Sequence, residues 1–96
     1  MRYFHRTSLP PDTVLTEADR FFSTCMSAAG SDKRRRDFVG NVGRISVRVA
    51  AEGGHYTLVT VETDQVGESE ADKIAKRFLA VVHKRTHPEH RVRGAY

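Results

Sequence analysis

The sequence predicts a small α+β domain, in which an antiparallel-rich sheet carries two amphipathic helices in a two-layer sandwich. The chain has 96 residues, the size of one domain spanning 1–96. Two segments repeat apolar residues every three or four positions, which is typical of helices. Others alternate polar and apolar residues, which is typical of half-buried strands. We expect the order β-α-β-β-α, with an optional final β and both helices on one face of the sheet.

The first predicted elements are a strand at residues 3–7 and a helix behind it. Aromatic and Thr residues favour the strand, and Pro10 and Pro11 end it because proline cannot donate to a ladder. Gly30 is a typical C-terminal stop for the helix. The apolar stripe of this helix comprises Val14, Leu15, Ala18, Phe21, Phe22, Cys25 and Met26. Cys25 is the only cysteine, which excludes an internal disulfide, and its place on the stripe predicts a buried, inert thiol.

The middle of the chain predicts a loop followed by a β-hairpin. Residues 31–37 are polar and basic, as in a loop. Residues 44–49 alternate strictly, and residues 56–63 are rich in Thr and Val. Residues 51–54 join them and offer two glycines for positive φ.

The second helix is predicted from a capping box, in which Ser69 is followed by Asp72 three residues later. Pro88 ends it. Its buried stripe comprises Ala71, Ile74, Ala75, Phe78, Leu79, Val81 and Val82. If residues 90–96 form a last strand, the topology is the split βαβ, ferredoxin-like arrangement. If they do not, a three-stranded sheet leaves one face to solvent or to a second subunit.

The split βαβ order is also that of the RNA-recognition fold, whose central strands carry a basic-Gly-aromatic-small-aromatic motif. Neither Tyr3-Phe4-His5-Arg6 nor residues 55–59 match that motif, and only Tyr56 offers a stacking ring in the second segment. The sequence therefore indicates no membership of that family.

Several classes of protein are excluded. No apolar stretch approaches the ~20 residues that a membrane-spanning helix needs, and the N-terminus lacks the apolar region of a secretory signal. We therefore expect a cytoplasmic protein that does not enter membranes.

Charge is segregated along the chain. Residues 31–50 carry six Lys and Arg against two acids, and residues 51–72 carry six acids and no Lys or Arg. Residues 73–96 carry seven Lys and Arg against Glu89. An anionic partner such as nucleic acid fits the basic segments. The phosphate contacts we expect are Lys33, Arg34, Arg35 and Arg36 in the loop, and Lys73, Lys76, Arg77 and Lys84 on the second helix. Arg44 and Arg48 share one face of their strand.

The alternative is a homo-oligomerising or protein-interaction domain, in which the acidic segment contacts a basic surface of another chain. Opposite charges that neutralise each other within the fold are also common.

Chemistry-bearing motifs are few. His83 and His87 lie one helical turn apart, with His90 beyond, which makes a weak candidate for a metal site because Lys84 and Arg85 repel a cation. No nucleophile elbow or phosphate loop is present. The sequence therefore predicts a non-catalytic binding module with no cofactor.

Overall fold

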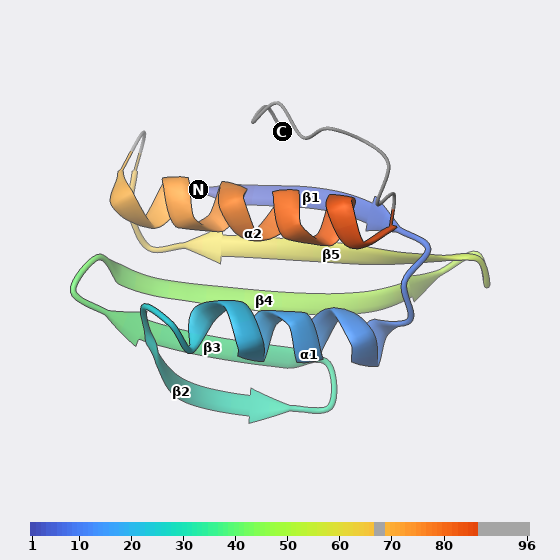
Figure 1. Ribbon diagram of the computed structural model, residues 1–96, viewed down its shortest axis with the longest axis horizontal. Helices are drawn as coiled ribbons and strands as arrows, with labels where there is room; N and C mark the ends of the chain where they lie inside the picture. Colours follow the sequence, from blue (N-terminus) through green and yellow to red (C-terminus); the bar gives the residue numbers. More distant parts are fainter. Residues whose placement is uncertain (67–68, 87–96) are drawn as a thin grey trace.

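The computed structural model describes residues 1–66 and 69–86, which form a five-stranded antiparallel sheet and two helices (Figure 1). The predicted α+β class is confirmed. The elements in chain order are β1 (Arg2–Thr7), α1 (Pro11–Phe22), β2 (Ser27–Asp32), β3 (Arg35–Gly40), β4 (Gly43–Glu52), β5 (Tyr56–Thr63) and α2 (Glu70–Thr86).

The sheet has the order β1-β5-β4-β3-β2, and each neighbouring pair is antiparallel. The last four strands form a meander of consecutive hairpins, and β1 pairs with β5 at the far edge. The chain order differs from the predicted β-α-β-β-α, because four consecutive strands, not two, lie between α1 and α2. Residues 90–96, the predicted final strand, lie outside the described residues.

Both helices lie on the same side of the sheet in Figure 1. Helix α1 packs against β3 and β4, and α2 packs against β1, β4 and β5. Three rings join these layers, since Phe22 stacks on Phe38 with centroids 4.6 Å apart and lies 5.2 Å from Phe78. The alternating valines Val47, Val49, Val59 and Val61 complete the core from the sheet.

The prediction of a loop at residues 31–37 is wrong, because these residues form the end of β2, a turn and the start of β3. Strand β2 has no buried residue, so it carries no apolar alternation from which a strand could be predicted. In β3 only Phe38 is buried, and Arg36 and Gly40 occupy the inward positions on either side of it.

The first helix ends at Phe22 rather than near Gly30. A short turn follows, in which the Met26 N–H donates to the Phe22 carbonyl at 2.7 Å. This turn returns the Met26 side chain to the core while Cys25 faces solvent. The expectation of a buried Cys25 is therefore wrong, because the apolar spacing continues past the end of the helix.

The turn and cap predictions are confirmed. Gly53 and Gly54 join β4 to β5 with φ of 63° and 76°. The Asp72 N–H donates to the Ser69 hydroxyl at 3.1 Å, which caps α2. Within residues 1–66 and 69–86, no helix has the length and apolar character to cross a membrane.

Candidate nucleic-acid interface

One face of the sheet is covered by the helices, and strand alternation directs a second set of side chains to the other, which we call the open face. Along β1 the alternation places Arg2, Phe4 and Arg6 there, while Thr7 is buried on the helix side. The same alternation applies to the strands that follow. Their open-face residues are Tyr56, Leu58, Thr60 and Glu62 of β5, Arg44, Ser46, Arg48, Ala50 and Glu52 of β4, and Arg35, Asp37 and Val39 of β3.

The register arranges these side chains in rows perpendicular to the strands. One row, which we call the arginine row, runs from Phe4 to Thr60, then to Arg48 and Arg35. It ends at Asp32 on β2. Neighbouring strands are about 4.8 Å apart, so this row crosses the whole sheet in about 19 Å.

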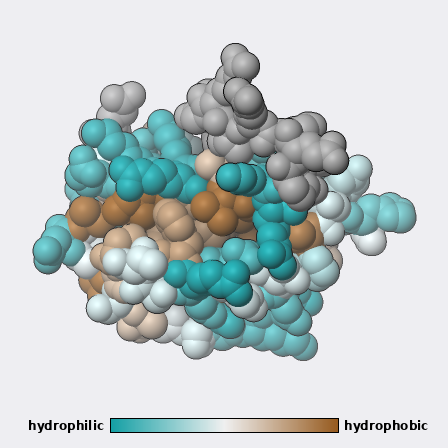
Figure 2. Space-filling model, in the orientation of Figure 1, coloured by the Kyte–Doolittle hydropathy of each residue, from teal (hydrophilic) through white to brown (hydrophobic). Residues whose placement is uncertain are grey.

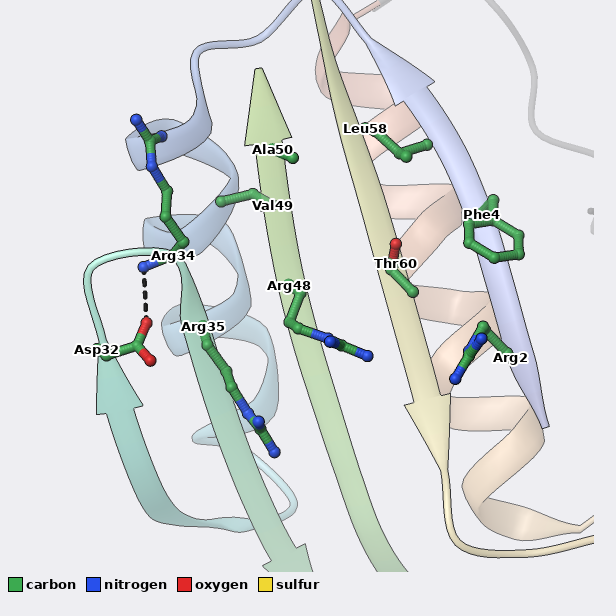
Figure 3. A pocket seen from close by; sticks show the side chains of 10 residues that line it. All are labelled: Arg2, Phe4, Asp32, Arg34, Arg35, Arg48, Val49, Ala50, Leu58 and Thr60. Carbon is green, nitrogen blue, oxygen red and sulfur yellow. Dashed lines mark hydrogen bonds between the residues drawn. The ribbon is translucent and has the colours of Figure 1, made fainter. Parts of the chain in front are cut away.

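A hollow of about 450 Å³ lies over this row. Figure 3 shows Arg2, Arg35 and Arg48 entering it from three different strands, with Arg35 and Arg48 extending toward β5 from one side and Arg2 from the other. Phe4 of β1 and Thr60 of β5 also line it. Its remaining lining is Asp32, Arg34, Val49, Ala50 and Leu58. We call this site the open-face hollow.

Carboxylates of the adjacent row hold the guanidinium groups in place. Arg48 Nη2 donates to Glu62, and Arg2 Nε lies 3.3 Å from the same carboxylate. These contacts, with the Arg48 hydrogen bond the largest, lower the pKa of Glu62. Arg35 Nε donates to Asp37 at 2.8 Å, which raises the pKa of Arg35.

The pKa of Asp37 results from two opposing effects. Burial alone would raise the pKa of Asp37, but hydrogen bonds from the Ser46 hydroxyl at 2.7 Å and from Arg35 outweigh it and lower the pKa. The carboxylates of Glu62 and Asp37 are therefore ionised at neutral pH. Each arginine is oriented and partly neutralised.

The face remains net positive. In the described part of the chain, six arginines lie on the open face or line its hollow, against four carboxylates. The arginines are Arg2, Arg6, Arg34, Arg35, Arg44 and Arg48, and the acids are Asp32, Asp37, Glu52 and Glu62.

The basic run at residues 33–36 is divided by the β2–β3 turn. Arg34 and Arg35 line the open-face hollow, and Lys33 is exposed at the turn. Arg36 instead faces the helix side, where its Nε donates to Asp19 of α1 at 3.2 Å and its Nη1 donates to the Asp32 carbonyl at 2.6 Å. Arg36 therefore ties the hairpin to α1.

The basic residues predicted on α2 lie on the other side of the sheet. Lys73, Lys76 and Arg77 line a hollow of about 210 Å³ on the helix itself, and Lys84 lines a separate one of about 430 Å³. Because α2 packs over β1 and β5 while the β2–β3 turn lies at the opposite edge, these two predicted sets do not form one surface.

Lys76 also has a structural role. Its ammonium lies 3.3 Å from the buried Asp72 and 5.6 Å from the centre of the Tyr3 ring, and the Tyr3 hydroxyl donates to the same carboxylate. This cluster joins α2 to β1. Figure 2 shows the helix side, where hydrophobic surface is framed by hydrophilic side chains.

Of the three histidines of the candidate metal site, the structure describes His83 alone. The ring of His83 lies 6.0 Å from that of His5 on β1, and His87 and His90 lie outside the described residues. Residues 1–66 and 69–86 contain no group of three or more His, Cys, Asp or Glu side chains placed to hold a metal ion.

Sequence reasoning missed Arg2, Phe4 and Thr60 as site residues. The signal was present in the alternation Arg2-Tyr3-Phe4-His5-Arg6, which places two cations and a ring on one face. Which face stays open depends on where the helices pack, and the alternation alone does not decide this. No protein-family model matches the chain, and a search of the curated proteins found no match.

Proposed function

We propose that this chain is a non-catalytic binding module that holds nucleic acid through phosphate contacts in the open-face hollow. The observation that carries the proposal is the convergence of Arg2, Arg35 and Arg48 from three strands on one hollow (Figure 3). Guanidinium groups suit phosphate because their planar donors match its oxygens.

The carboxylates beside these arginines are compatible with phosphate binding. A guanidinium has five N–H donors, and the contact with Glu62 or Asp37 uses only part of them. The arginine side chains in these pairs remain 46% to 58% exposed, so their other donors are accessible to a ligand. The carboxylates pre-orient the arginines and moderate the affinity.

The same contacts count against the alternative, in which the acidic segment binds another chain. Each acid of this segment in the described residues already has a partner within the molecule. Glu52 pairs with Arg6, Glu62 with Arg2 and Arg48, Glu70 with Lys73, Asp72 with Lys76, and Asp64 accepts the Arg44 N–H. Self-association through these charges would have to compete with those contacts.

The test compares two double variants that remove the same charge from different faces. R35A/R48A removes two cations from the open-face hollow, and K73A/R77A removes two from α2. Fluorescence anisotropy with random-sequence oligonucleotides, repeated over a range of salt concentrations, gives the affinity and its salt dependence. We expect R35A/R48A to weaken binding for all sequences alike and to reduce the slope of log K against log salt by about 1.4 for single strands.

K73A/R77A is the control and should keep the wild-type slope. Equal losses in both variants would reduce the proposal to a general charge effect. If no oligonucleotide binds at low salt, the proposal is wrong, and sedimentation at low and high salt then tests the oligomer alternative. Thermal unfolding of each variant confirms that it is folded.

A further inference from the structure

We infer that the open-face hollow selects single-stranded nucleic acid, with one unpaired base stacked on the ring of Phe4. This inference rests on the proposed function. It adds that the nucleic acid is single-stranded and that Phe4 contacts one of its bases.

Phe4 differs from the other four phenylalanines of the chain. Phe21, Phe22, Phe38 and Phe78 pack on one another with ring centroids 4.6 to 5.8 Å apart. Phe4 is instead 60% exposed on the open face and lines the hollow that the arginines enter. An exposed ring gains stability when another apolar or aromatic surface covers it.

Cations surround this ring at distances suited to a nucleic-acid backbone. Arg2 and Arg6 lie two residues away on either side along β1, which is about 7 Å. In the arginine row, Arg48 lies two strands from Phe4 and Arg35 three strands, which is about 10 Å and 14 Å between backbones. A strand whose base lies on Phe4 can therefore continue across Arg48 and Arg35 with its phosphates on the guanidinium groups.

The open face of the sheet favours a single strand over a duplex. Duplex readers usually insert a helix or a two-stranded ribbon into a groove, whereas base stacking on an aromatic side chain needs a base that is free of its neighbours. Thr60 lies between Phe4 and Arg48 in the row, and its hydroxyl both donates and accepts hydrogen bonds. The hollow thus combines a stacking ring, a neutral polar group and two cations in one line.

The experiment measures the anisotropy of labelled single-stranded and double-stranded oligonucleotides with F4L, F4Y and Y56L. Tyr56 is the matched control, because it is also an exposed aromatic residue of β5 on the open face but does not line the hollow. We expect F4L to weaken single-strand binding about tenfold without changing the salt slope, because stacking is not ionic. F4Y should retain the wild-type affinity, and Y56L should change it less than twofold.

The outcomes separate this inference from the proposed function. If F4L binds single strands as tightly as wild type does, or if Y56L loses as much affinity as F4L, the proposal that a base stacks on Phe4 is wrong. If R35A/R48A still reduces the salt slope in that case, the phosphate-binding function stands alone. If the wild-type protein binds single and double strands with equal affinity, the proposed selection for single strands is wrong. If neither binds, the proposed function itself fails.

Discussion

Glu62 is the residue on which the charge balance of the open-face hollow depends. It accepts from Arg48 and lies beside Arg2, so one carboxylate restrains two of the three converging guanidinium groups. Removing its charge should release both arginines toward an anion. The acid and the cations therefore act in opposition on phosphate binding.

We predict that E62Q strengthens oligonucleotide binding at neutral pH by roughly two- to fivefold, the effect of one exposed charge pair. Fluorescence anisotropy at constant salt measures it. The control is E70Q, which removes the same charge from α2, where Glu70 pairs with Lys73. Weaker binding by E62Q than by wild type would show that Glu62 supports the ligand rather than restraining the arginines.

The difference in stability between E62Q and wild type should depend on pH. The pKa of Glu62 in the folded protein lies below its ordinary value of 4.5, because Arg48 and Arg2 favour the carboxylate. Its stabilising contribution is therefore complete above that ordinary value and is lost as the pH falls through the lowered pKa. E62Q should be less stable than wild type near pH 7, and the difference in unfolding free energy should vanish at low pH.

At the scale of elements, the start of β4 depends on a close approach between the backbone of Gly43 and the side chain of Asp64. Gly43 has φ of 121°, and a Cβ there would lie 2.5 Å from the Asp64 carboxylate. Asp64 accepts the Arg44 N–H at 3.0 Å, which lowers the pKa of Asp64 and fixes the chain after β5 against β4. Any side chain at position 43 would displace this contact.

We predict that G43A lowers the free energy of unfolding by about 2 to 4 kcal/mol, through backbone strain and the displaced carboxylate. G54A is the control, because Gly54 has φ of 76° but a Cβ at that position would meet nothing within 4 Å. G54A should lower the free energy of unfolding by only about 1 to 2 kcal/mol. Urea unfolding of both variants measures the difference, and equal losses would mean that the contact with Asp64 contributes nothing.

Elements whose buried face follows a simple period were predictable from the sequence. Strands β4 and β5 and helix α2 each repeat apolar residues at the spacing of their structure. Strand β2 was not predictable, because it lies at the edge of the sheet with all of its residues exposed. The end of α1 was missed because Met26 enters the core from a turn at a position that also fits a helix.

At the scale of the whole molecule, the topology decides which charges act together. The sequence separates Arg2 from Arg35 and Arg48, but the pairing of β1 with β5 brings the three to one hollow. The same topology moves the basic residues of α2 to the opposite side of the sheet. Segment charge predicted a basic surface for an anionic partner, but the residues that compose such a surface depend on pairings between distant strands.

The most direct test of the central claim is an NMR titration with a single-stranded oligonucleotide that follows the arginine Nε–Hε signals. Arg2, Arg35 and Arg48 report on the open-face hollow, and Arg77 and Arg85 report on α2. We predict that the first three signals shift in a saturable manner while the signals from α2 stay in place. Shifts confined to Arg77 and Arg85 would contradict the account and assign binding to the helix side.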